Sequence, residues 1–108
     1  MSPKKEPHVL LVDPNGETLT TLYSILDQEG CQVATSHPDN EALRYVAAHK
    51  PDVALVGRHP DDAPAGFLSQ SIERLSPRTR ILLFDPSQPW RRESSFVQDL
   101  VRRVKETV

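Results

Sequence analysis

The chain has 108 residues, of which 37% are hydrophobic and 26% charged, enough for one domain with a single core. Its formal net charge of −2 is too small to favour nucleic acid as a partner. Cys31 is the one cysteine, which excludes an internal disulfide. No apolar run reaches membrane-spanning length, and residues 1–7 resemble neither a signal peptide nor an anchor. We therefore expect a cytoplasmic protein with no membrane partner.

The first part of the chain alternates strand and helix patterns. Residues 1–7 are predicted to be a disordered lead-in, followed by a buried apolar strand over 8–12. Helical spacing of apolar residues predicts a helix over 17–28, and Gly30 is its expected stop signal. Residues 31–35 alternate polar and apolar, which predicts a strand at the edge of the sheet.

The second part repeats this alternation. Proline and acidic residues at 38–41 open a second helix, and the apolar run at 53–56 predicts a strand buried on both faces. A polar loop is expected over 58–66, then a helix that ends before Pro77. Residues 81–84 predict the last strand. The predicted buried stripes of the three helices are Leu19, Leu22, Tyr23 and Leu26; Leu43, Val46 and Ala47; and Leu68, Ile72 and Leu75.

A final helix begins near Ser95, where Gln98 three residues later completes a capping-box pattern. Its predicted stripe is Phe96, Leu100 and Val104. The alternation of strands and helices predicts an α/β fold with a doubly wound parallel sheet and helices on both faces. Because the second strand has an edge pattern, the expected spatial order of the strands is 2-1-3-4.

The chain resembles the receiver domain of bacterial response regulators, a flavodoxin-like phosphoacceptor module of two-component phosphorelay signalling. The resemblance covers residues 8–85 and the last helix, within a receiver-like domain spanning 8–108. Each motif is short, and it is their order and spacing that carry the likeness. The matching segments are Val9–Asp13, Glu29–Val33, Asn40–Leu43, Lys50–Val56 and Leu75–Phe84.

The resemblance implies a phosphorylation pocket, and this chain departs from it at most positions. Asp13 matches one of two metal-binding acids, but Pro14 stands at the second and offers no ligand. Gly57 stands at the phosphoacceptor aspartate, and Asp85 at the Ser/Thr that reads the added charge. The family's lysine has no clear counterpart, since Gln88 begins a Gln-Pro-Trp sequence in place of its Lys-Pro-Phe. Such a pocket cannot support phosphoryl transfer, which depends on metal clamping and charge placement.

The resemblance therefore implies a pseudo-receiver: a protein-interaction module that is not an enzyme, needs no cofactor and acts without phosphorylation in signalling or transcriptional regulation. One alternative is a phosphorylatable receiver with a relocated acceptor, Asp85 or Asp61. Another is a flavodoxin-like domain that binds a small ligand at a crevice beside Asp13, Gly57 and Arg58.

The segment between Asp85 and Ser95 is too short for the helix and strand that the family places there. The sheet is therefore expected to have four strands, with residues 81–84 at an edge that favours association. The candidate interface consists of Leu82, Phe84, Trp90 and Phe96. Either a homodimer or another protein binds at this side, or the chain covers the edge itself.

Several features allow two interpretations. Asp13 and Asp85 are expected at the carboxyl end of the sheet, near His59, Asp61 and Asp62. These residues would form either a rebuilt metal site or a solvated acidic rim, and Arg58 could instead pair with Asp13. Trp90 is either a lid over the core or a partner anchor. The histidines show no ligand spacing, and the C-terminal basic residues are interrupted by acids, which favours a solvated helix face.

Overall fold

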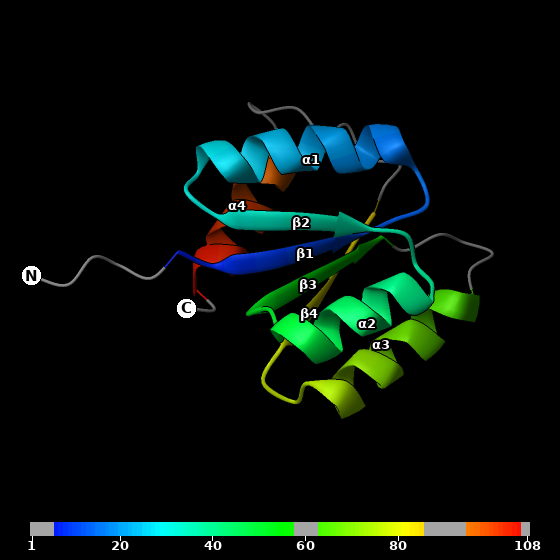
Figure 1. Cartoon of the computed structure of the whole chain (residues 1–108). Helices are drawn as coiled ribbons and strands as arrows, with labels where there is room; N and C mark the ends of the chain where they lie inside the picture. Colours follow the sequence, from blue (N-terminus) through cyan, green and yellow to red (C-terminus); the bar gives the residue numbers. More distant parts are fainter. Residues whose placement is uncertain (1–5, 58–62, 86–94, 107–108) are drawn as a thin grey trace, which may run out of the picture.

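Four parallel strands form one sheet in the order β2-β1-β3-β4 in the computed structural model, and helices cover both faces (Figure 1). The structure describes residues 6–57, 63–85 and 95–106. In chain order the elements are β1 His8–Val12, α1 Gly16–Gln28, β2 Gln32–Ser36, α2 Asn40–His49, β3 Val53–Gly57, α3 Ala63–Leu75, β4 Arg80–Phe84 and α4 Ser95–Glu106. The predicted α/β class and strand order are confirmed.

The two central strands are buried along almost their whole length. β1 pairs in parallel with β2 on one side and β3 on the other, with Val12 opposite Val56. Every residue of β3 is buried, as continuous apolar runs predict for strands covered on both faces. The backbone of Pro7, just before β1, is hydrogen-bonded to β2: its carbonyl accepts a hydrogen bond from the Gln32 N–H at 2.8 Å.

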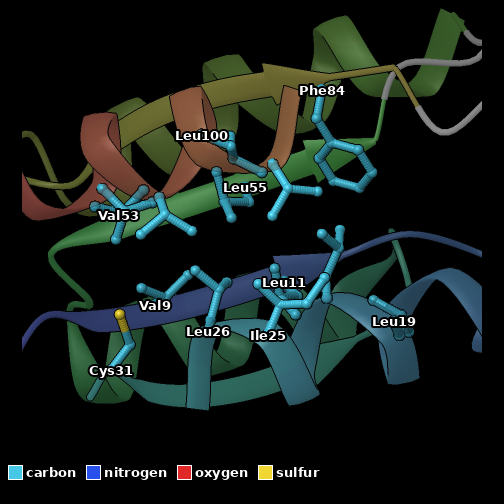
Figure 2. Close-up of a cluster of buried hydrophobic side chains, with 14 residues drawn as sticks. Val9, Leu11, Leu19, Ile25, Leu26, Cys31, Val53, Leu55, Phe84 and Leu100 are labelled. Carbon is cyan, nitrogen blue, oxygen red and sulfur yellow. The ribbon is translucent and has the colours of Figure 1, made fainter. Parts of the chain in front are cut away.

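The core consists of two layers separated by the sheet. Helices α1 and α4 pack on one face and α2 and α3 on the other (Figure 1). Figure 2 shows the first layer, in which Leu26 of α1 and Leu100 of α4 point toward side chains of β1 and β3. Val9 and Leu11 belong to this layer, whereas Leu10 belongs to the other, because neighbouring strand residues face opposite sides. Among the described helices, none combines the length and apolarity needed to cross a bilayer.

The predicted helix stripes need three corrections. Tyr23 and Leu75 are 43% and 41% exposed, since each lies at the margin of its helix's apolar face. Ala47 is also exposed, and Ala42 is buried in its place. Positions 42 and 46 are one helical turn apart and share a face, whereas position 47 is turned about 100° away from position 46.

One helix boundary and the width of one apolar helix face also differ from the prediction. α3 begins at Ala63, inside the expected loop, because a proline in the first helical turn costs no hydrogen bond. In α4, Val97 and Val101 are buried together with Leu100 and Val104, so the apolar face is wider than the predicted stripe. The side chain of Phe96 lies outside the described residues.

The end of α1 is fixed by a glycine, as the sequence predicts. Gly30 has a φ of 87°, a left-handed conformation that residues with a β-carbon adopt at a cost. Its N–H bonds to the Asp27 carbonyl, and the Cys31 N–H bonds to the Leu26 carbonyl, both at 3.1 Å. This pair of bonds is the Schellman motif, and it turns the chain directly into β2.

We predict that Gly30→Ala lowers the free energy of unfolding by about 1–2 kcal/mol, the cost of a left-handed alanine. Gly16→Ala is the matched control, because an added β-carbon meets no atom within 4 Å at either glycine and only Gly30 has a positive φ. Urea denaturation measures both, and an equal effect of the two substitutions would contradict the assignment.

Candidate functional site

The candidate site lies where β1, β3 and β4 end, the usual place for function in an open parallel sheet. Asp13 directly follows β1, and Gly57 and Phe84 are the paired last residues of β3 and β4. Asp13 is fully buried and Phe84 is 4% exposed. Figure 2 shows the Phe84 ring pointing into the core. The structure therefore brings together the two predicted pocket residues Asp13 and Gly57.

The Asp13 carboxylate occupies the space beside Gly57. A β-carbon built on Gly57 would lie 1.9 Å from Asp13 Oδ1 and 2.9 Å from Asp13 Cγ. It would also lie 3.2 Å from Cζ of Phe84. Since these separations are shorter than van der Waals contact, any other residue at position 57 requires Asp13 to move. The φ of Gly57 is not in the left-handed region, so its backbone conformation does not require glycine. The reason for glycine at this position is the close packing of Asp13.

Local hydrogen bonds hold Asp13 in this position. The Asn15 N–H donates to Asp13 Oδ2 at 2.9 Å, and the Asp13 N–H donates to the Ser36 carbonyl at 3.2 Å. Oδ1 of Asn15 caps α1 by accepting hydrogen bonds from the N–H groups of Glu17 and Thr18. The buried carboxylate is therefore tied to the turn that starts α1, near the positive end of that helix.

The structure describes only part of the remaining predicted pocket. Pro14 and Asp85 are exposed, and Gln88, together with residues 58–62, lies outside the described part of the chain. Within that part, no three His, Cys, Asp or Glu side chains are grouped so as to hold a metal ion.

The predicted interface residues lie at different depths. Leu82 is half-buried against the α1/α4 layer, and Phe84 is buried at the sheet's end, so a partner cannot reach its side chain at the surface. Leu83, which the prediction omitted, is 48% exposed. Its place in the strand is the signal for this, since Leu82 and Phe84 share one face and Leu83 points to the other. Trp90 lies outside the described residues.

A groove between α1 and α4 is a second surface feature that sequence reasoning missed. It has a volume of about 650 Å³. Apolar side chains from both helices and a set of charged and amide side chains line it: Ile25, Gln28, Glu29, Val97, Gln98, Val101, Arg102, Lys105 and Glu106. The predicted α4 stripe lacked Val97 and Val101, so the groove could not be placed from the sequence.

Aromatic rings gather at the opposite end of the sheet, where β1 begins. His8 Nε2 is hydrogen-bonded to the Tyr45 hydroxyl, and the Tyr45 ring stacks on His49 with centroids 4.2 Å apart. Burial raises the pKa of Tyr45. We interpret this cluster as structural, because it joins β1 to α2.

Comparison with models of known protein families and with curated proteins gives no match. The receiver resemblance therefore stays a prediction from the sequence motifs. The physical findings that bear on function are the filled space at Gly57, the exposed Leu83 of β4 and the groove between α1 and α4.

We predict that Gly57→Ala lowers the free energy of unfolding by about 1–3 kcal/mol, the usual cost of overpacking. In an Asp13→Ala background the same substitution should cost clearly less, because the colliding carboxylate is gone and only the Phe84 ring remains close. A double-mutant cycle by urea denaturation measures this coupling. Equal costs in the two backgrounds would show that the carboxylate does not fill the space.

We also predict that Cys31 reacts slowly with thiol reagents in the native protein. Its side chain is 4% exposed within the α1/α4 layer. Burial raises the pKa of its thiol, an effect that Lys105 partly opposes, so little thiolate forms near neutral pH. A colorimetric thiol assay should show a marked rate increase in denaturing urea. Fast reaction without urea would contradict the buried placement.

Proposed function

We propose that this chain is a pseudo-receiver: a non-catalytic module that binds a protein partner in bacterial signal transduction or transcriptional regulation, without phosphorylation. The observation that carries the proposal is the placement of Asp13. In the resemblance, position 57 holds the phosphoacceptor, and here the Asp13 carboxylate lies 1.9 Å from where even a β-carbon at that position would be.

The same placement argues against metal-assisted phosphoryl transfer at this end of the sheet. Mg²⁺ requires oxygen ligands in near-octahedral geometry and keeps several waters. Asp13 is fully buried and accepts a hydrogen bond from the Asn15 N–H, while Pro14 has no side-chain oxygen. Gly57 has no nucleophile to receive the phosphoryl group.

A protein partner suits the remaining surface better than nucleic acid does. The basic residues of α4 are locally neutralised: Asp99 forms ion pairs with both Arg102 and Arg103. Lys105 lies 3.9 Å from a carboxylate oxygen of Glu29. These pairs are exposed and contribute little to stability, but they divide the positive charge into separate neutralised sites, whereas nucleic-acid binding favours a continuous basic patch.

A relocated acceptor is the second candidate, and one observation favours it. Asp85 directly follows β4 and is exposed, so a phosphodonor could reach its carboxylate. Asp61, the other candidate acceptor, lies outside the described residues.

The test is to incubate the protein with Mg²⁺ and acetyl phosphate and to measure the mass of the intact chain by mass spectrometry. We expect no gain of a phosphoryl group, because position 57 has no nucleophile and Pro14 replaces the second metal-binding acid. A gain that disappears in Asp85→Asn would establish the relocated acceptor and contradict the proposal. A gain that persists in Asp85→Asn would contradict it as well, and peptide mapping would then locate the acceptor.

A further inference from the structure

The connections from α2 to β3 and from α3 to β4 lie side by side at the amino end of the sheet. The Thr79 hydroxyl donates to the Pro51 carbonyl at 2.7 Å, and the Arg80 N–H donates to the Asp52 carbonyl at 2.9 Å. Because β3 and β4 are parallel neighbours, both connections reach the same end (Figure 1). This is the end of the sheet opposite the candidate site.

The connection before β4 is a tight turn that holds Arg78 on a fixed backbone. The Thr79 N–H donates to the Ser76 carbonyl at 3.0 Å, with Pro77 at the turn position that proline favours. The hydroxyl oxygens of Ser76 and Thr79 are 2.6 Å apart, and both residues are buried. Arg78, between them, is exposed. A charged side chain presented on such a pre-ordered turn loses less entropy when it binds a partner.

The neighbouring connection begins with a lysine in an unfavourable backbone conformation. Lys50 has a φ of 44°, and no other non-glycine residue in the described part of the chain has a positive φ. The corresponding left-handed residue at the end of α1 is Gly30, which adopts this conformation without the cost that a β-carbon brings. A lysine within the last turn of α2 would interact with the negative end of the helix without that cost. Strained residues are found preferentially at functional sites, so the exposed Lys50 side chain calls for a functional explanation.

The positive charges at this end have no acidic partners, in contrast to those of α4. Arg102 and Lys105 of α4 lie 2.5 and 3.9 Å from carboxylate oxygens. Lys50 and Arg78 form no ion pair with any residue of the described part of the chain. Their charges are therefore available to an anionic group from another molecule.

Two further arginines extend the positive charge along the chain. Arg74 and Arg80 flank Arg78 in sequence, and both are exposed. Glu73 precedes them, and Asp52 lies in the neighbouring connection, where it is half-buried and its Oδ2 accepts a hydrogen bond from the first N–H of β1 at 2.9 Å. Positive charge thus predominates at this end, although the whole chain has a net charge of −2.

We propose that this amino-end surface (Lys50, Arg74, Arg78 and Arg80) binds an acidic segment of the partner protein, an inference that rests on the proposed function in taking the partner to be a protein. Guanidinium and ammonium groups form charge-assisted hydrogen bonds with the carboxylates of such a segment. Nucleic acid is less complementary, because residues 50–52 and 76–79 include no aromatic side chain on which bases could stack. The negative net charge of the chain also repels a long polyanion, whereas a short acidic segment meets only the local positive charge.

The first test titrates the whole chain into a fluorescein-labelled oligoglutamate peptide and follows fluorescence anisotropy, with an oligoglutamine peptide of equal length as the uncharged comparison. We expect saturable binding of oligoglutamate alone, weakened by added salt. Lys50→Gln combined with Arg78→Gln should weaken it by about fivefold or more, because two exposed ion pairs are lost. Lys105→Gln combined with Arg102→Gln is the matched control, since it removes the same two residue types from α4, and it should bind as the wild type does.

Three results would overturn the proposal. They are no saturable binding of oligoglutamate by the wild type, equal loss of binding in the two double variants, and tighter binding of an oligothymidine than of oligoglutamate. The third result would identify nucleic acid as the better partner for this surface.

The second test separates the charge of Lys50 from its backbone conformation. Lys50→Gly should raise the midpoint of urea denaturation, because glycine adopts the left-handed conformation at little cost, and should weaken oligoglutamate binding. Peptide binding that is unchanged in Lys50→Gly would show that the lysine has no part in the surface and would overturn the proposal. Neither test involves phosphorylation: a failure here leaves the pseudo-receiver proposal standing, whereas a phosphoryl gain from acetyl phosphate would contradict that proposal without changing peptide binding.

Discussion

The close contact between the Asp13 carboxylate and the backbone of Gly57 is the constraint on which the carboxyl end of the sheet depends. Any side chain at the end of β3 would displace Asp13, since a β-carbon there would lie 1.9 Å from Asp13 Oδ1. A buried carboxylate is costly unless hydrogen bonds compensate for lost solvation, and the Asn15 N–H supplies one of them. The turn after β1 and the end of β3 are therefore built as one unit.

This unit closes one end of the sheet. At the closed end, the space that a reacting group would need is filled by Asp13 and bordered by Phe84. Away from this end, Leu83 of β4 is 48% exposed among the described residues. Under the pseudo-receiver proposal, shape and surface, rather than a chemical step, are what such a scaffold offers to a partner.

Much of the fold could be predicted because its signals are local. The continuous apolar runs of β1 and β3, the alternation in β2 and the glycine after α1 each report their own environment. The margins of helix faces could not be predicted: Tyr23 has helical spacing but lies beside the buried face. The Asp13–Gly57 contact also escaped prediction. The sequence placed both residues at one end of the sheet, but their contact depends on strand register and on the direction of one side chain.

The most direct test of the central claim is an NMR titration of the labelled protein with Mg²⁺ and beryllofluoride, a mimic of a bound phosphoryl group. If Asp13 fills the space beside Gly57, the amide resonances of Asp13, Asn15 and Gly57 should not change. Saturable shifts of these three resonances would show that the end of the sheet can admit a metal and a phosphoryl group, and would contradict the account.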